Sequence, residues 1–428
     1  MISIGIDLGT TSIKVCIVRG REPLTEKTVR HGADILGKLG LQDASNILEV
    51  AVRVLKETVA EFRDQHMTET ISRLRIAGQM HGLVLWNEDS LLGGTLDCSP
   101  LYTWMYPNPQ DRTLPAPSRP VYPGFGALTL FQMKSYGNWN RCGTIMDLFA
   151  CHLCGLREVK MSWQLAESWG YCSDGRWDVS LEERVIGRIS LPEIIEDDQY
   201  CLGQVGFDFL KGLDVLITLG DLQASIKSVA DKGLDAAYLI LGTSSQLCVI
   251  APQSVTVSHP TVDRLPYSLD RVILAGRSMN GGNAIDAFLK MVANWNRDLT
   301  GTEPEQPDIE RLLRQVDEQA VGKILVSAVP TFIQERGFAL TGGSVSGLDH
   351  DTSIVQIVQA ICTGVVDNLV NLFPLHILSS LGIKRLHMVG NAKKPRFSRR
   401  IQDVCQTIGL DAIPAKNDTS AAYGAAIF

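Results

Sequence analysis

The sequence contains no run of 18 consecutive apolar residues, no block of five basic residues and no strong excess of either charge sign. Without a long apolar run, nothing in it indicates a membrane-spanning helix. Its 40 basic and 47 acidic side chains leave a net charge of −7, which is too mild to attract nucleic acid or an anionic membrane. We therefore expect neither nucleic acid nor a membrane as a partner.

The chain also lacks the marks of export. The segment from Met1 to Asp7 has no basic stretch before its apolar residues, and Asp7 interrupts the apolar run. The ten cysteines are scattered through a chain much longer than the usual disulfide scaffold. A reducing compartment, and hence a cytoplasmic location, is the expectation.

Cys151 and Cys154 have the spacing of half a zinc site. A structural zinc needs four ligands, however, and no second CxxC or HxxxH pair follows at a typical distance. Residues 145–155 instead have the pattern of an apolar helix that ends at Gly155. We predict that both cysteines pack as small hydrophobic side chains.

Two familiar nucleotide-binding signatures, GxxxxGK[ST] and GxGxxG, are missing as well. The sequence has instead a repeated turn, Leu8-Gly9-Thr10-Thr11-Ser12 and Leu241-Gly242-Thr243-Ser244-Ser245, each between two apolar strands. A repeat in the same context in both halves indicates an internal duplication. Since 428 residues exceed one ordinary core, we predict two domains, residues 1–226 and 227–428.

Each strand–Gly-Thr–strand turn exposes backbone N–H groups and hydroxyls at one point, which suits phosphate oxygens. Two such turns, one from each domain, are predicted to hold a triphosphate from both sides. Taken singly, each turn is better explained as a tight connection with no ligand.

Two aspartates follow apolar strands. Asp7 precedes the first turn, where a carboxylate holds Mg²⁺ through water or only caps the turn. Asp221 follows the strand Ile217–Gly220, and strand ends are where open α/β folds place their chemistry. It is a candidate base for a sugar hydroxyl, with Gln223 as a candidate to orient the sugar, or else it is a solvated turn residue.

Two glycine turns in the second half are further candidates. Gly281 and Gly282 precede the apolar helix predicted for residues 284–292, and they allow a backbone to approach a ligand closely. Gly390 and Asn391 follow another apolar strand and are a candidate seat for adenine or ribose.

The surrounding elements are predicted from periodicity. A helix is expected at residues 43–63 and a strand at 74–77. Residues 107–123 hold six prolines and are expected to form a surface insertion within the first domain.

These motifs, in this order, resemble the FGGY carbohydrate kinases, a branch of the actin, hexokinase and heat-shock chaperone superfamily, with the greatest likeness to its sedoheptulokinases. The likeness spans essentially the whole chain. It rests on GIDLGTTSIK at 5–14, GQMHG at 78–82, TW at 103–104, GFG at 124–126, CGTIMD at 142–147, CGL at 154–156, MSWQLAESWGY at 161–171, LGDLQAS at 219–225, LGTSSQL at 241–247, MNGGN at 279–283 and PTFIQER at 330–336.

The resemblance implies an α/β fold of two ribonuclease-H-like domains, the first for sugar and the second for nucleotide, with a cleft between them. It implies ATP and Mg²⁺ as cofactors, sedoheptulose as substrate, and a monomer or homodimer. It assigns Asp221 as general base, Asp7 and Asp221 to Mg²⁺ through water, and a sugar pocket to Gln79, Met80, His81 and Trp104. The nucleotide would be held by Thr10, Thr11, Lys14, Gly242, Thr243, Gly281, Gly282, Gly390 and Asn391.

The chain departs from the family pattern at two places. Tyr106 stands where the family usually has an acidic residue two positions after the tryptophan, and Asp111 with Arg112 is a candidate replacement. Arg396 stands where an asparagine is common. Xylulose, glycerol, or a protein that binds sugar and nucleotide without transfer therefore remain alternatives, while a chaperone or filament subunit is disfavoured.

Overall fold

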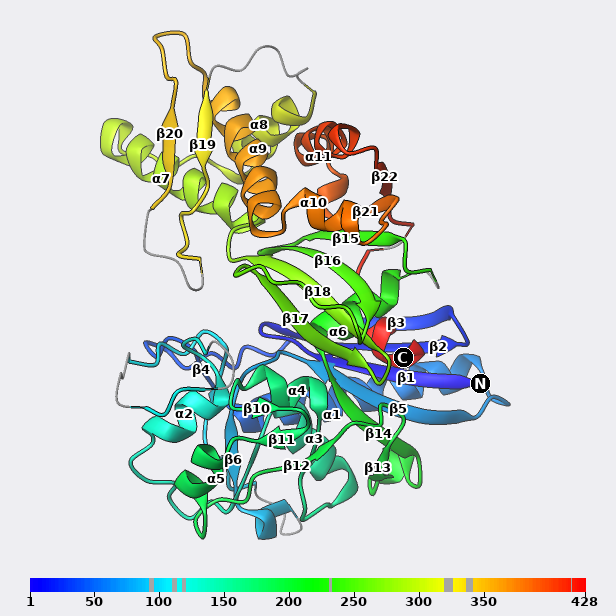
Figure 1. The fold of residues 1–428 in the computed structure, drawn as a ribbon. Coiled ribbons are helices and arrows are strands. Elements are labelled where there is room, and N and C mark those ends of the chain that lie inside the picture. The colour runs from blue at the N-terminus through cyan, green and yellow to red at the C-terminus, as the bar shows by residue number, and fades with distance from the viewer. Residues whose placement is uncertain are drawn as a thin grey trace. The chain divides into compact units, whose positions relative to one another are not determined.

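The computed structural model describes residues 1–91, 96–109, 114–117, 121–230, 233–318, 326–335, 342–416 and 418–428. They form two compact units (Figure 1). The first unit contains Met1–Ser228, Pro266–Leu269 and Ser420–Phe428, and the second contains Val229–Leu265 and Asp270–Thr419. The C-terminal helix thus belongs to the first unit, whereas the sequence-based division assigned it to the second domain.

The first unit is built on a six-stranded sheet in the order β13-β14-β5-β1-β2-β3. Strands β1, β2 and β3 are antiparallel neighbours, and β1, β5 and β14 run parallel. The strands of this sheet are β1 (Ile2–Leu8), β2 (Ser12–Arg19), β3 (Glu22–Arg30), β5 (Ile71–Gly78), β13 (Cys201–Gln204) and β14 (Asp214–Gly220).

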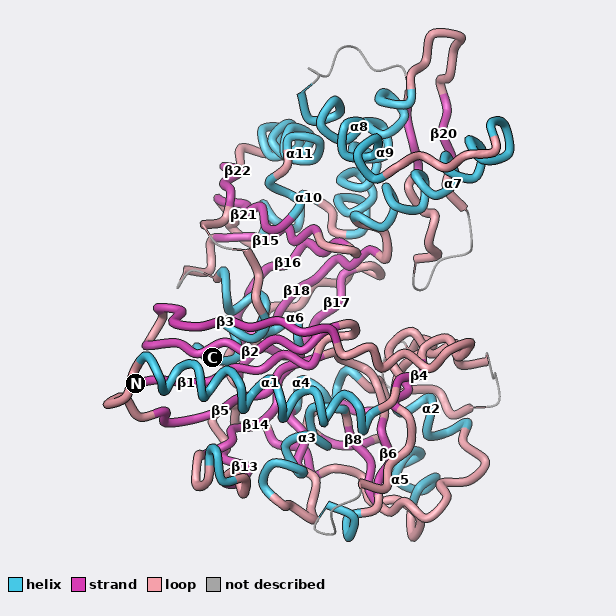
Figure 2. Tube along the Cα trace, turned by 180° about the vertical axis from the view of Figure 1, so that it is seen from behind, coloured by secondary structure: helices cyan, strands magenta, loops and turns pink. Residues whose placement is uncertain are grey.

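Helix α1 (Ala44–Gln65) lies across β1, β2 and β3 (Figure 2). Helix α12 (Ala421–Ile427) packs on β1, β2 and β5. The remaining elements of this unit are β4 (Leu41–Gln42), β6 (Val84–Trp86), β7 (Leu101–Tyr102), α2 (Gly126–Gln132), β8 (Arg141–Gly143), α3 (Ile145–Cys154), β9 (Lys160–Ser162), α4 (Trp163–Ser168), β10 (Cys172–Ser173), β11 (Arg176–Trp177), α5 (Val179–Val185), β12 (Glu193–Ile195) and α6 (Asp221–Val229), with short 3₁₀ turns at Glu88–Leu91 and Asp208–Leu210.

The second unit has its own six-stranded sheet, in the order β17-β18-β16-β15-β21-β22. Helices α7, α9 and α11 supply many of the side chains of its core. The elements are β15 (Ala236–Leu241), β16 (Ser245–Pro252), β17 (Val262–Ser268), β18 (Arg271–Ser278), α7 (Gly282–Thr300), α8 (Gln306–Glu318), β19 (Ser327–Val329), β20 (Ser344–Ser346), α9 (Ile354–Leu372), α10 (Leu375–Ser380), β21 (Arg385–Gly390), a 3₁₀ turn at Asn391–Lys393, α11 (Pro395–Thr407) and β22 (Asp411–Pro414).

The two sheets repeat one topology. In the first, β3-β2-β1 are antiparallel and β5 then β14 continue in parallel; in the second, β18-β16-β15 are antiparallel and β21 then β22 continue in parallel. The repeated turn falls at the same place in each: Leu8 and Leu241 end β1 and β15, and Ser12 and Ser245 begin β2 and β16. The strand order therefore supports the duplication inferred from the sequence, and the mixed α/β fold of two ribonuclease-H-like domains is confirmed.

The predicted helix at residues 43–63 is also confirmed. It begins one residue later, because Asp43 is its N-cap and its carboxylate accepts a hydrogen bond from the backbone N–H of Asn46. This contact satisfies one of the unpaired donors of the first helical turn.

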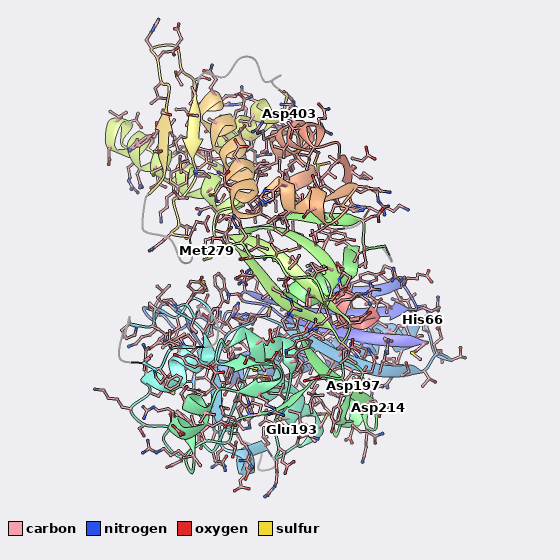
Figure 3. All side chains as sticks on the ribbon, in the orientation of Figure 1. His66, Glu193, Asp197, Asp214, Met279 and Asp403 are labelled. Carbon is pink, nitrogen blue, oxygen red and sulfur yellow. The ribbon has the colours of Figure 1, made fainter. Side chains whose placement is uncertain are left out.

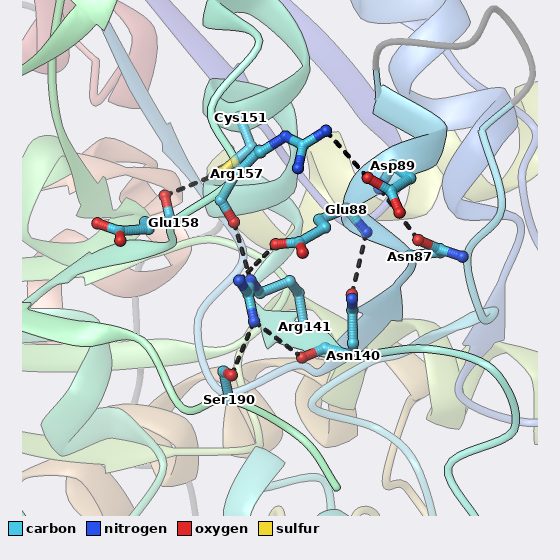
Figure 4. A network of polar contacts seen from close by, with 9 residues as sticks. All are labelled: Asn87, Glu88, Asp89, Asn140, Arg141, Cys151, Arg157, Glu158 and Ser190. Carbon is cyan, nitrogen blue, oxygen red and sulfur yellow. Dashed lines mark hydrogen bonds and ion pairs between the residues drawn. The ribbon is translucent and has the colours of Figure 1, made fainter. Parts of the chain in front are cut away.

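The segment containing Cys151 and Cys154 is helix α3, which ends at Gly155 in the left-handed conformation, as predicted. The Cys151 thiol is buried and lies 4.0 Å from the carbonyl oxygen of Glu158 (Figure 4). Burial raises the pKa of this thiol well above its usual range, so Cys151 carries its proton.

Helix α9 is the one helix in the described residues whose length and hydropathy match those of a membrane span. More than half of it is buried inside the second unit, where Val358, Ile361 and Val365 are among the core residues. A core helix passes the same test, and this burial accounts for its apolar composition.

Candidate functional site

Three parallel strand ends meet at one edge of the first sheet. In the register of the sheet, Leu8 of β1 lies beside Gly78 of β5, and Gly78 lies beside Gly220 of β14. The residues at or just after these ends are Asp7, the segment Gln79–His81, and Asp221. The carboxyl edge of a parallel sheet is where ligands bind in open α/β folds.

Asp7 is the most perturbed carboxylate at this edge. Its pKa is raised to about 7, chiefly by burial and next by the charge of the nearby Asp221, while Lys14 acts in the opposite direction. Within the described residues, the buried Oδ1 of Asp7 accepts no hydrogen bond. A divalent cation with its water shell would relieve both the repulsion and the unmet acceptor, so the donor set fits Mg²⁺ held through water.

Asp221 is the first residue of helix α6, not part of a turn as the sequence suggested. Its Oδ1 accepts a hydrogen bond of 2.8 Å from the backbone N–H of Leu222, which fixes the carboxylate at the end of β14. An acidic residue in the first turn is favoured by the helix dipole, which explains why the helix begins here.

Gln79, Met80 and His81 follow β5 directly and are all buried. Met80 lies against the backbone at Gly220, where a Cβ would come within 2.7 Å of its sulfur. The buried Oε1 of Gln79 has no partner among the residues that the structure describes.

His81 adopts a positive φ of 74°, which is uncommon for a residue with a side chain. Its ring stacks on Phe125 at 4.3 Å, and its Nδ1 lies 2.6 Å from the carbonyl oxygen of Ser168. A carbonyl oxygen can only accept, so Nδ1 of His81 carries a proton in this contact. The strain is held by packing at a site that the sequence associated with the sugar.

Trp104 connects the predicted sugar pocket to the first phosphate turn, because its indole N–H donates to Oγ1 of Thr10 at 3.0 Å. Thr11 is exposed at the tip of this turn. Lys14, on β2, forms an ion pair with Glu26 at 3.5 Å.

Gly124 packs closely on Trp104. Its φ is 88°, and a Cβ at this position would lie 2.0 Å from the Trp104 carbonyl oxygen. The close contact and the positive φ explain why this position is a glycine.

Gln223 is fully buried in α6, and its Nε2 donates to the carbonyl oxygen of Pro266 at 3.0 Å. Its Oε1 is buried and, in the described part of the chain, unpartnered. Gln223 therefore lies on the same helix as Asp221, two residues further along, and its amide nitrogen is already hydrogen-bonded to the protein backbone.

Two residues of this edge were not singled out from the sequence. Gln42 is buried and donates to the carbonyl oxygen of Thr10 at 2.7 Å, while its Oε1 accepts from Gln79 at 3.1 Å. It thus joins the phosphate turn to the sugar-side glutamine. Nothing local in the sequence marks it, because its partners are distant in the chain.

The second missed residue is Asp147. Its carboxylate accepts from Oγ1 of Thr218 on β14 at 2.7 Å and from Thr144, with which it forms a capping box. Burial raises its pKa to about 6. The Thr-x-x-Asp spacing at 144–147 is the signal that would have found the cap, and Asp147 braces the strand that carries Asp221.

In the second unit, the three predicted nucleotide-side segments come together. The backbone N–H of Gly242 closes its turn on Ser244 at 2.9 Å, Gly282 N–H donates to the Gly242 carbonyl at 2.9 Å, and a Cβ on Gly282 would lie 3.5 Å from the side-chain nitrogen of Asn391. Thr243 accepts from the N–H of Asn283 at 3.1 Å. A Cβ on Gly281 would collide with Ser244 at 2.5 Å, so this close approach requires glycine.

Gly390 ends β21 beside Leu241 and has a positive φ of 65°, and Asn391 follows it. The N–H of Gly390 donates to Asp418 at 3.3 Å. Arg396 is bonded to Asp317 through two nitrogens, at 2.7 and 3.0 Å, which gives this departure from the family pattern a structural partner.

The other departure, Tyr106, packs edge-to-face on Tyr102 at 4.9 Å. Asp111 and Arg112, its candidate replacements, lie outside the described residues. No cluster of three histidine, cysteine or acidic side chains placed to bind a metal is found in the described ranges.

No protein-family model matches the chain. It is 30% identical to a sedoheptulokinase of Homo sapiens over 478 aligned positions, covering 100% of the chain and 96% of that protein. A sedoheptulokinase of Mus musculus is 29% identical, with 100% and 96% covered. A xylulose kinase from Brucella ovis has a similar fold, with a TM-score of 0.78 and 19% identity over 100% of this chain and 89% of the other. A glycerol kinase from Plasmodium falciparum with ADP superimposes with a TM-score of 0.76 at 16% identity, covering 99% and 88%.

Proposed function

Because the chain belongs to the FGGY family of carbohydrate kinases and is itself a carbohydrate kinase that uses ATP, we propose that it phosphorylates sedoheptulose to sedoheptulose 7-phosphate. The specific sugar is taken from the curated relatives. The observation that carries the chemistry is the common edge of β1, β5 and β14, which gathers Asp7, Gln79–His81 and Asp221.

In the proposed reaction, Asp221 removes the proton from the terminal hydroxyl of the sugar as the hydroxyl oxygen forms a bond to the γ-phosphorus of ATP. The bond between the γ-phosphorus and the bridging oxygen breaks, and ADP leaves with that oxygen. Phosphoryl transfer needs mainly alignment and charge stabilisation, so one positioned carboxylate suffices as base.

Asp7 and Asp221 are proposed to hold Mg²⁺ through water, and the cation supplies charge neutralisation on the phosphate oxygens. The perturbed pKa and the unmet acceptor of Asp7 support this role.

The first unit is proposed to bind the sugar through Gln79, Met80, His81, Trp104 and Gln223. The phosphates are proposed to contact Thr10, Thr11 and Lys14 there and Gly242, Thr243, Gly281 and Gly282 in the second unit, with Gly390 and Asn391 beside the adenosine. We further propose a cytoplasmic enzyme that is a monomer or homodimer.

Xylulose and glycerol are the second candidate substrates, since solved proteins of this fold include kinases of both. A site that pairs particular hydroxyls discriminates strongly between sugars, so turnover separates these candidates. Purified protein with MgATP is offered sedoheptulose, xylulose and glycerol in parallel, and ADP release is followed.

The proposal predicts the highest kcat/KM with sedoheptulose. A higher value with xylulose or glycerol would reassign the substrate. Ligand-induced thermal stabilisation with no ADP release from any of the three would instead identify a protein that binds without transfer.

A further inference from the structure

A buried carboxylate of the second unit, Glu335, has no part in the chemistry described above. It is 6% exposed. Burying a carboxylate is costly unless several hydrogen-bond donors contact its oxygens.

Four donors converge on it. Oε1 accepts from the Ser278 hydroxyl, from Nδ2 of Asn280 at 2.8 Å and from Nδ2 of Asn368 at 2.9 Å. Oε2 accepts from the backbone N–H of Met279 at 2.7 Å. Hydrogen bonds to an ionised acceptor are stronger than those between neutral groups.

Three of the four donors belong to consecutive residues, Ser278 to Asn280, at the end of β18. Met279 of this segment is labelled in Figure 3. The fourth, Asn368, is on α9 and also donates to the Ser278 hydroxyl at 3.0 Å. Glu335 therefore ties the end of a strand to a core helix.

Both the side chain and the carbonyl oxygen of Asn280 form hydrogen bonds with other segments. Its Nδ2 donates to the carbonyl oxygen of Ile333 at 2.7 Å, and its Oδ1 accepts from the N–H of Ile333 at 3.0 Å. Its carbonyl oxygen accepts from the hydroxyl of Ser245 at 2.8 Å. Ser245 is the residue that follows the Gly242–Ser244 turn.

The segment fixed in this way leads directly into Gly281 and Gly282. Gly282 N–H donates to the carbonyl of Gly242, and Asn283 N–H to that of Thr243. A shift of Asn280 would therefore move both glycine segments that are proposed to contact the nucleotide phosphates.

We infer that Glu335 is a positioning residue that sets the nucleotide affinity of the second unit by holding Ser278–Asn280 against the Gly242 turn. The inference rests on the proposed nucleotide role of Gly242, Thr243, Gly281 and Gly282. It does not rest on phosphoryl transfer, so it is tested by binding alone.

Glu335→Gln is the decisive variant. A glutamine keeps the size of the side chain, but its amide nitrogen cannot accept from Met279 N–H, and in the flipped orientation it cannot accept from the three donors on Oε1. The dissociation constant of ADP with Mg²⁺ is measured by calorimetry for the full chain, together with the melting temperature. The matched control is Glu310→Gln, an exposed residue of α8.

We expect Glu335→Gln to weaken ADP binding about tenfold, the effect of losing one charge-assisted hydrogen bond. Sedoheptulose binding should change less than twofold, and the control should match wild type in both. Unchanged ADP affinity, or an equal loss for ADP and sugar, would overturn the inference. ADP binding too weak to measure in wild type would overturn it as well.

Asn368→Ala covers the case in which Glu335→Gln does not fold. It removes one of the four donors and leaves the carboxylate in place, so ADP binding should weaken about threefold, with sugar binding kept. Wild-type ADP affinity in this variant would contradict the positioning role. A wild-type protein that binds ADP but releases none from ATP would reject the proposed reaction and leave this inference standing.

Discussion

At the residue scale, the carboxylates of Asp7 and Asp221 repel each other, and this repulsion contributes to the raised pKa of Asp7. The pKa of Asp7 is raised to about 7, chiefly by burial and next by the charge of Asp221. In the unfolded chain the same group titrates near its ordinary value of roughly 4. A raised pKa in the folded state means that the folded protein holds this proton more tightly than the unfolded chain does.

The sign of the pH effect follows. The contribution of Asp7 to stability is fully present below about pH 4 and is lost as the pH rises through about 7. We therefore expect the ligand-free wild type to lose stability relative to Asp7→Asn between pH 5 and pH 8. Urea unfolding of both proteins across this range measures the difference. A constant gap between them would show that Asp7 is not perturbed.

Gln42 gives a second residue-scale prediction. Gln42→Leu keeps the volume but leaves the carbonyl of Thr10 and the amide of Gln79 without their buried partner. Each unmet group costs about 1–3 kcal/mol, so we expect both lower stability and about a tenfold higher KM for the sugar. Steady-state kinetics with Gln65→Leu, an exposed residue at the end of α1, as the control, checks it. A sugar KM equal to that of wild type would show that Gln42 does not contribute to sugar binding.

The site residues differ in whether the neighbouring sequence marks them. Asp7, Asp221 and the glycine turns were predicted, since each stands at the end of an apolar strand in the sequence. Gln42 and Asp147 were not, because their partners Thr10, Gln79 and Thr218 lie far away in the chain. Contacts of this kind depend on the finished sheet and leave no periodic signal.

At the scale of elements, the C-terminal helix α12 contacts both β1 and α6 so closely that there is no room for an added side chain. A Cβ on Gly5 of β1 would lie 1.9 Å from the carbonyl oxygen of Ala422, and one on Gly424 would lie 1.8 Å from that of Ala224. Since α6 begins with Asp221, this packing also supports the proposed base.

We expect Gly5→Ala to destabilise the protein by about 1–3 kcal/mol or more, because backbone atoms cannot move aside as a flexible side chain does. The control is Gly206→Ala, whose Cβ would meet Leu153 only at 3.7 Å. Denaturant unfolding of the two variants and wild type provides the measurement. Equal stability of Gly5→Ala and Gly206→Ala would refute the tight packing of α12.

The same helix lies outside the domain to which the sequence-based division assigned it. The hairpin of β1 and β2, helix α1 and helix α3 follow from local periodicity and caps, and the structure confirms them. The membership of Ser420–Phe428 in the first unit does not follow, because small residues such as Ala422 and Gly424 carry little hydrophobic pattern. Their signal is the close approach they permit, which is seen only in three dimensions.

At the scale of the whole molecule, the duplication accounts for most of what the sequence predicted. One five-residue repeat located two strand pairs, and each lies in a sheet with the same order of antiparallel and parallel strands. The family follows from relatives at 30% identity along the whole chain. The choice of sugar is not encoded in this topology, since kinases of xylulose and glycerol have the same fold.

The central claim is that Asp221 is the base for transfer from ATP to the sugar. The most direct test is the rate of ADP release with MgATP and sedoheptulose, for wild type, Asp221→Asn and Asp214→Asn. Asp214 lies at the opposite end of β14 and provides a matched control. We predict that Asp221→Asn lowers kcat by about 10²-fold or more while Asp214→Asn leaves it unchanged. Equal rates for wild type and Asp221→Asn would contradict the account.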